Sequence, residues 1–112
     1  MATHHAAPGE IVDLATWAQD VPNEKTKVIA KTDEMELVRL VLPAGKEFAN
    51  HKVSGPCVIH CITGEIECAA MGGTEVLTSG QLLYLMPDEP HSVRAVVDSV
   101  VLLTIIFFLP TN

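Results

Sequence analysis

The stretch GQLLYLMPDEPHSVRA, residues 80–95, holds two strand-like runs on either side of a loop that contains two prolines. Residues 81–86 are mostly aliphatic, and the run from residue 91 to residue 97 is rich in β-branched and small side chains. Proline fixes the backbone angle φ and lacks an N–H donor, so Pro87 to Pro90 is predicted to be a rigid loop. His91 is the first residue of the second strand of this strand–loop–strand unit. The same pattern of short strands and turns guides the interpretation of the rest of the chain.

Similar short runs, each bounded by Gly, Pro, Asp or Ser, lie on both sides of this unit. We predict strands at 11–14, 26–31, 36–42, 46–53, 57–63, 65–70, 74–77, 81–86, 91–97 and 100–109, and one helical turn at 15–19. About ten strands at intervals of roughly 8–12 residues predict an all-β sandwich or barrel. No longer stretch with helical periodicity competes with this prediction.

The length and composition suit one folded domain. The chain has 112 residues, of which 48% are hydrophobic and 19% charged, enough apolar material for a buried core. We expect a disordered or extended tail at 1–9 and a single domain at 10–112.

The charge balance argues against nucleic acid and anionic membranes as partners. The formal net charge is −7, and the seven Lys and Arg residues form no patch that could neutralise phosphates. The longest apolar run, 100–109, is about half of the ~20 residues that a membrane helix needs. Residues 1–10 show no signal peptide, and three cysteines suggest reduced thiols, so we expect a cytoplasmic protein.

The predicted strand at 100–109 is apolar on both faces, interrupted only by Thr104. A strand on the outside of a monomeric barrel should have one polar face. The simplest explanation is a homodimer in which a second subunit covers the outer face of this strand. The alternative is cover from the chain's own N-terminal segment.

The segment from Gly45 to Gly64 resembles the first motif of the cupin superfamily. That motif is a Gly, five residues, His-x-His, three or four residues, Glu, six residues and Gly. The spacing places His51 at the first histidine position, Val53 at the second histidine position and Cys57 at the glutamate position. Two of the three expected metal ligands are therefore replaced.

The segment from Gly80 to Ala95 is similar to the second cupin motif. In that motif a Gly is followed by five residues, Pro-x-Gly, two residues, His, three residues and Asn. Met86 and Asp88 stand at the Pro and Gly positions, and His91 stands at the histidine position. The resemblance covers about residues 28–109. It implies a double-stranded β-helix, or jelly-roll barrel, but that superfamily hosts dioxygenases, isomerases, sugar-nucleotide enzymes, storage proteins and sensors, so it selects no activity.

If the same strand positions point into the barrel as in the family, the resemblance implies a pocket between the two motifs. Such a mainly apolar cavity favours a small-molecule ligand that one or two imidazoles hold in place. The direction of Phe48 and Tyr84 is not fixed by the sequence. The residues expected to line the pocket are His51, Val53, Cys57, Ile59, Cys61, His91 and Val93.

A metal-dependent enzyme, dioxygenase-like or isomerase-like, is the main alternative to a binding barrel. Catalytic cupins hold their metal with three His and one Glu, whereas this chain keeps His51 and His91. Cys57 could be a third ligand, and two imidazoles with a thiolate would suit a divalent metal such as Zn, Fe, Ni or Cu. Otherwise the two histidines line the pocket without a metal.

The three cysteines allow a second alternative, a thiol redox sensor. A two-residue turn at Thr63 and Gly64 would pair Ile59 with Cys68, which predicts Cys57, Cys61 and Cys68 on one face. Buried cysteines also serve simply as small hydrophobic side chains. His60 alternates with its neighbours in the strand, so we expect it to point outward.

Overall fold

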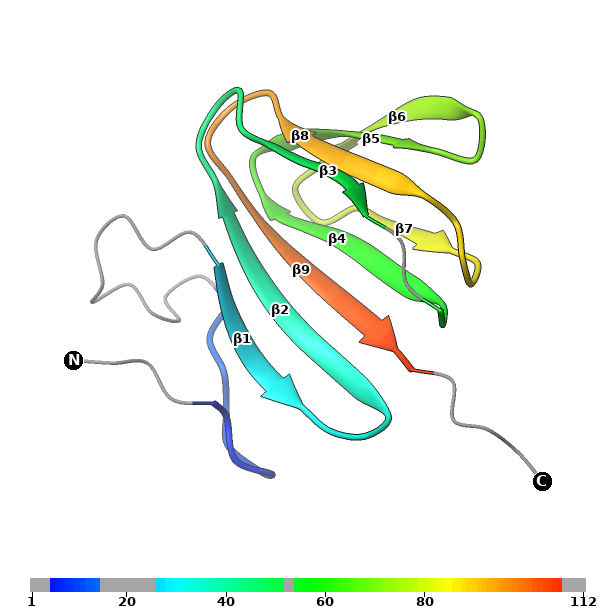
Figure 1. The fold of residues 1–112 in the computed structure, drawn as a ribbon. Helices are drawn as coiled ribbons and strands as arrows, with labels where there is room; N and C mark the ends of the chain where they lie inside the picture. Colours follow the sequence, from blue (N-terminus) through cyan, green and yellow to red (C-terminus); the bar gives the residue numbers. More distant parts are fainter. Residues whose placement is uncertain (1–4, 15–25, 52–53, 108–112) are drawn as a thin grey trace.

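The chain forms two antiparallel β-sheets and no helix within the described residues of this computed structural model, which are 5–14, 26–51 and 54–107 (Figure 1). None of these residues belongs to a helix long and apolar enough to cross a membrane. The strands are β1 (Thr26–Lys31), β2 (Met35–Leu42), β3 (Glu47–His51), β4 (Cys57–Thr63), β5 (Glu65–Ala70), β6 (Gly73–Thr78), β7 (Leu82–Leu85), β8 (His91–Ala95) and β9 (Ser99–Ile106).

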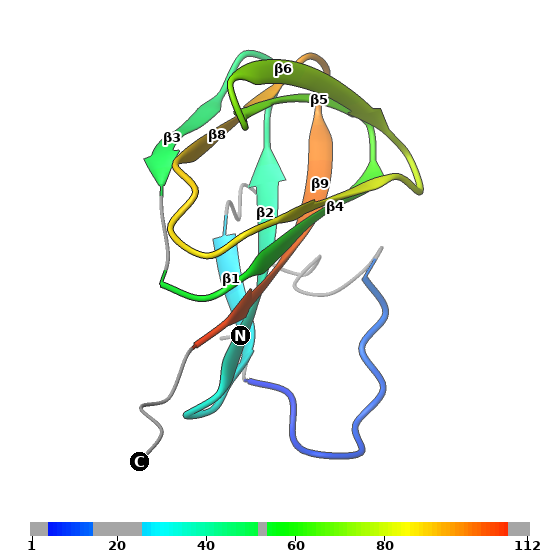
Figure 2. The ribbon, with the colours of Figure 1, turned by 90° about the vertical axis from the view of Figure 1, so that its right-hand side faces the viewer.

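The sheets have the orders β1-β2-β9-β4-β7 and β3-β8-β5-β6. Figure 2 shows the four-stranded sheet curving over one side of the five-stranded sheet. The predicted all-β jelly-roll architecture is confirmed. Strand β9 is central to the larger sheet, where β2 pairs on one side and β4 on the other.

The core lies between the two sheets and follows from alternation within each strand. In β4, Cys57, Ile59 and Cys61 are buried, while Val58 and His60 between them are only half-buried. Successive side chains of a strand point to opposite faces, so the buried set faces the core and the other set faces outward. The outward direction predicted for His60 agrees with this alternation.

The turn predicted at Thr63 and Gly64 is not a hairpin, which makes the predicted pairing of Ile59 with Cys68 wrong. Strand β4 pairs with β7 and β9, whereas β5 pairs with β6 and β8. The chain therefore changes sheets at Gly64, which has φ +99. A Cβ there would approach the side chain of Ser99 and lie 2.7 Å from the Asp98 carbonyl oxygen. Only glycine fits this corner without displacing the start of β9.

The strand predicted at 11–14 is also wrong. Residues 5–14, called the N-terminal strap below, are described without any strand and run beside β1 (Figure 1). The Ala6 N–H donates to the Ile29 carbonyl oxygen at 2.6 Å, and Arg39 Nε donates to the Leu14 carbonyl oxygen at 2.8 Å. Ile11 is 90% exposed, whereas Val12 and Leu14 are half-buried, so this segment packs on the sheet without joining it as a strand. The helical turn predicted at 15–19 lies outside the described residues.

Candidate functional site

The backbone brings the two motif histidines together. Strands β3 and β8 are neighbours, and their register places His51 directly opposite His91. A register shift between Phe48 and His51 interrupts the ladder just before this pair. The side chain of His51 and all of Val53 lie outside the described part of the structure, so their role in the pocket stays a prediction.

His91 points into the barrel. Its side chain is 4% exposed, and the next residues on the same face of β8, Val93 and Ala95, are fully buried. His91 Nδ1 lies 3.1 Å from the Glu89 carbonyl oxygen. If Nδ1 carries the proton and donates this bond, Nε2 carries the lone pair of the neutral ring. A buried imidazole fixed in this way can accept a hydrogen bond from a ligand or bind a metal ion through Nε2.

The loop before His91 is held in a defined shape. Asp88, at the glycine position of the cupin motif, has φ +64, a left-handed conformation that Asp tolerates better than most residues. The Met71 N–H donates to Glu89 Oε2 at 2.9 Å, which ties the turn between β5 and β6 to this loop. The loop therefore presents the Glu89 carbonyl to the imidazole from a restrained position.

The described remainder of the predicted pocket wall is buried in the core. Cys57 is 3% exposed, and Ile59, Cys61 and Val93 are fully buried within one contiguous hydrophobic cluster. Phe48 packs against this cluster, whereas Tyr84 is 61% exposed on the opposite face of its sheet. The inner faces of β4 and β8 beyond His91 are thus made of aliphatic and sulfur groups.

The three thiols are free and poorly suited to reaction. All three are buried, and burial raises the pKa of the Cys57 thiol. Burial and the neighbouring Cys61 raise the pKa of Cys68 to about 11. Cys61 Sγ lies 3.6 Å from the carbonyl oxygens of Thr63 and Gly64, as a weak donor. A reactive thiol needs access and a lowered pKa, so this environment counts against the redox-sensor alternative.

The donor set fits a metal ion only in part. Within the described residues, no group of three or more His, Cys, Asp or Glu side chains could hold one. His91 Nε2 suits a divalent metal, but Cys57 would have to bind as a thiolate, which its burial disfavours. The set His51, Cys57 and His91 therefore depends on the His51 side chain and on ionisation of a buried thiol.

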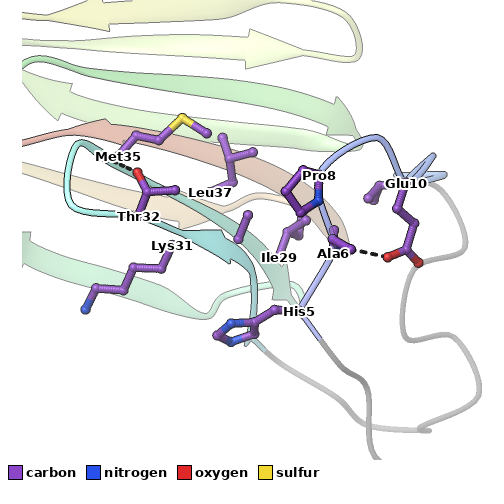
Figure 3. A pocket seen from close by; sticks show the side chains of 12 residues that line it. His5, Ala6, Pro8, Glu10, Ile29, Lys31, Thr32, Met35 and Leu37 are labelled. Carbon is purple, nitrogen blue, oxygen red and sulfur yellow. Dashed lines mark hydrogen bonds between the residues drawn. The ribbon is translucent and has the colours of Figure 1, made fainter.

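A cavity outside the barrel was not predicted from the sequence. It has a volume of about 490 Å³ and lies between the N-terminal strap and the outer side of β1 and β2. Figure 3 shows Ala6 and Pro8 of the strap beside Ile29 and Leu37 of the sheet, with His5 and Lys31 farther out. No local pattern could reveal it, because it exists only where two segments about 20 residues apart lie against each other.

No protein-family model matches the chain, and no curated protein matches it significantly. Many solved structures, in contrast, match the fold of this chain. A cupin superfamily protein from Desulfitobacterium hafniense DCB-2 is 11% identical, with 96% of this chain and 100% of that chain covered at a TM-score of 0.80. An RmlC-like cupin protein from Desulfovibrio desulfuricans is 25% identical, with 95% and 96% covered at a TM-score of 0.67.

An enzyme is also among the similar structures. The DMSP lyase DddQ from Ruegeria pomeroyi DSS-3 is 18% identical, with 78% of this chain but 48% of that chain covered and a TM-score of 0.66. Identities this low establish a shared fold and leave the chemistry open.

Proposed function

We propose that this chain, a small domain with the cupin fold, is a small-molecule-binding barrel whose metal site is partly lost. The observation that carries the proposal is the register pair of His51 and His91 in a wall that is otherwise apolar where it is described. In an antiparallel ladder, residues directly opposite each other share one face. Position 51 is therefore expected to share the inner face of His91.

The chemistry of this wall defines the ligand class. Val93, Ala95 and Ile59 offer only dispersion contacts, so most of the ligand must be apolar. The His91 imidazole, oriented by the Glu89 carbonyl, would exchange one hydrogen bond with a hydroxyl, carbonyl or carboxyl group. A compact aliphatic or aromatic molecule with one polar head fits this description.

Histidine-ring NMR of the ¹⁵N-labelled protein tests the ligand class directly. The probes are hexanol, hexanoate and benzoate, titrated into protein kept under reducing conditions. We expect at least one probe to shift the His91 ring signals saturably, and His91→Gln to remove that binding while the protein stays folded by circular dichroism. His60→Gln is the matched control, because His60 points away from the core.

Two results would contradict the proposal. One is that no probe binds with a dissociation constant below about 1 mM, which corresponds to a binding free energy of about −4 kcal/mol. The other is that a probe binds His91→Gln as tightly as the unchanged protein. His51→Gln provides a second variant if His91→Gln does not fold.

A metal-dependent enzyme is the second candidate function, favoured by the fold shared with the lyase and by the Nε2 lone pair of His91. In that case His51, Cys57 and His91 would hold a divalent ion that supplies Lewis-acid or redox chemistry. Elemental analysis after incubation with Zn, Fe, Ni or Cu separates the candidates. The binding barrel predicts a metal-to-chain ratio near zero, unchanged in His51→Ala, whereas a ratio near one that His91→Gln abolishes would establish the metal site instead.

A further inference from the structure

The backbone of Glu89 is restrained on both sides. The Glu89 N–H closes a turn by donating to the Met86 carbonyl oxygen at 3.4 Å. Inside this turn Pro87 precedes Asp88, which has φ +64, and a proline before a positive φ is the order of a type II turn. Pro90 comes next, and a proline confines the residue before it to an extended conformation. The Glu89 carbonyl therefore has little freedom to rotate.

The side chain of Glu89 adds a third restraint. Its Oε2 accepts a hydrogen bond of 2.9 Å from the Met71 N–H. Met71 and Gly72 form the two-residue turn between β5 and β6, with φ +53 and +78, so this N–H lies beyond the β5–β6 ladder. Figure 1 shows this turn and the loop between β7 and β8 at the same end of the barrel. The carboxylate thus ties the loop to the smaller sheet through a charge-assisted hydrogen bond.

The restrained carbonyl of Glu89 determines which ring nitrogen of His91 carries the proton. Nδ1 lies 3.1 Å from this carbonyl oxygen, and the residue is only 4% exposed. A carbonyl oxygen only accepts hydrogen bonds, so Nδ1 has to be the donor. The neutral imidazole has a single N–H, which makes Nε2 an acceptor. Any group that meets Nε2, from the protein or from a ligand, then has to donate.

We infer that Glu89 is a positioning residue that fixes the Nδ1–H tautomer of His91, and that the barrel therefore selects ligands whose polar head donates a hydrogen bond. The ligand class rests on the function proposed above and narrows it, whereas the tautomer is a property of the ligand-free protein. Alcohols and amides with an N–H meet the requirement, while ethers, ketones and carboxylates can only accept.

The wall beside His91 makes this selection effective. Val93 and Ala95 follow His91 on the same face of β8 and are fully buried. Their side chains offer no hydrogen bond to a polar head that Nε2 rejects. A polar group that is buried without a partner loses its hydrogen bonds to water, which costs binding free energy. We expect about a 10-fold preference for a donor over an acceptor of equal size.

Ring ¹H–¹⁵N correlation spectra, which distinguish Nδ1–H from Nε2–H imidazoles, test the tautomer without a ligand. The full chain is kept under reducing conditions at about pH 8.5, where an ordinary imidazole is neutral. The His91 signals are those missing from His91→Gln. We expect the Nδ1–H form in the unchanged protein and in Glu89→Gln, whose side-chain oxygen can still accept from the Met71 N–H. Glu89→Ala loses that bond and should show a mixture of the two tautomers.

Glu67→Ala is the matched control, because it removes the same charge and a side-chain contact from the same sheet. Glu67 forms a solvent-exposed ion pair of 2.9 Å with Arg94, so its loss should leave the His91 ring signals in the Nδ1–H form. Glu89→Ser replaces Glu89→Ala if circular dichroism shows that variant to be unfolded. An Nε2–H ring in the unchanged protein, or a tautomer that neither Glu89→Ala nor Glu89→Ser alters, would overturn the role of Glu89. Equal changes in Glu67→Ala and Glu89→Ala would do the same.

Hexan-1-ol and methyl pentyl ether, isomers of equal size of which only the alcohol donates, test the ligand class. Titration followed by NMR should give hexan-1-ol a dissociation constant lower by about 10-fold or more, and this ratio should fall below about 3-fold in Glu89→Ala. Equal binding of the two isomers, or binding of hexanoate without binding of hexan-1-ol, would overturn the inference and leave the proposed function standing. Absence of binding by every probe would overturn the proposed function and the ligand class together, and the ring spectra would then decide the role of Glu89 alone.

Discussion

Gly64→Ala should destabilise the domain more than an ordinary glycine substitution does. An L-residue at the φ of +99 found here is strained by ~1–2 kcal/mol. The added Cβ would also lie 2.7 Å from the Asp98 carbonyl oxygen and 2.8 Å from Ser99 Cα, and backbone at the start of β9 cannot rotate away. Overpacking of this kind typically costs about 1–3 kcal/mol. Together the two effects reach about 2–5 kcal/mol, a large part of the 5–15 kcal/mol typical of a domain.

Gly72→Ala separates the two effects. Gly72 also has a positive φ, +78, but a Cβ there meets no atom within 4 Å. Its substitution should therefore cost only the conformational part, about 1–2 kcal/mol. Urea unfolding followed by far-ultraviolet circular dichroism, at one protein concentration, gives both free energies. Equal losses for Gly64→Ala and Gly72→Ala would refute the argument that the corner between the sheets requires a glycine for lack of space.

Three further predictions concern the core and the surface. The free energy of unfolding should fall as the pH rises from the unfolded thiol pKa of 9.0 to about 11, because the folded Cys68 keeps its proton longer than the unfolded chain does. The free energy of unfolding is measured against pH for the unchanged protein and for Cys68→Ala. The difference between the two curves should show that Cys68 accounts for about 2–3 kcal/mol of this loss. Leu40→Ala should destabilise by about 2–5 kcal/mol in urea unfolding, since Leu40 is 1% exposed in the core; a loss below 1 kcal/mol would contradict that placement. Glu67→Gln should change stability by less than about 1 kcal/mol in the same assay, because its ion pair with Arg94 is solvent-exposed, and a larger loss would argue against that exposure.

Strand positions were largely predictable from local pattern. The ranges 57–63 and 65–70 are those of β4 and β5, because alternation and flanking glycines mark both strands. The predicted strand at 11–14 failed because apolar alternation shows only that a segment could be half-buried in a sheet. Whether another strand pairs with that segment depends on the tertiary structure. The register shift between Val28 and Ala30 in β1 was likewise not predictable, because a bulge depends on the twist of the paired strands.

The candidate site was predicted in part. The resemblance to the two cupin motifs identified His51 and His91, and the register shows that their backbones meet. The partners of the cysteines were misassigned, because a Thr-Gly turn can close a hairpin or carry the chain into another sheet. The strand pairing shows which outcome occurs, because β4 pairs with β7 and β9 while β5 pairs with β6 and β8. The bond from His91 Nδ1 to the Glu89 carbonyl also needed the folded loop.

By itself, the sequence determined an all-β domain, because periodicity and turn residues act over a few neighbouring residues. The two histidines were singled out by the resemblance to the cupin motifs. The tertiary structure decided which strands pair, which thiols are buried and which half of the outer sheet face the N-terminal strap covers. Those outcomes depend on contacts between residues far apart in the chain. The strand pairing that buries the core best is the one that forms, and the preferences of neighbouring residues do not specify it.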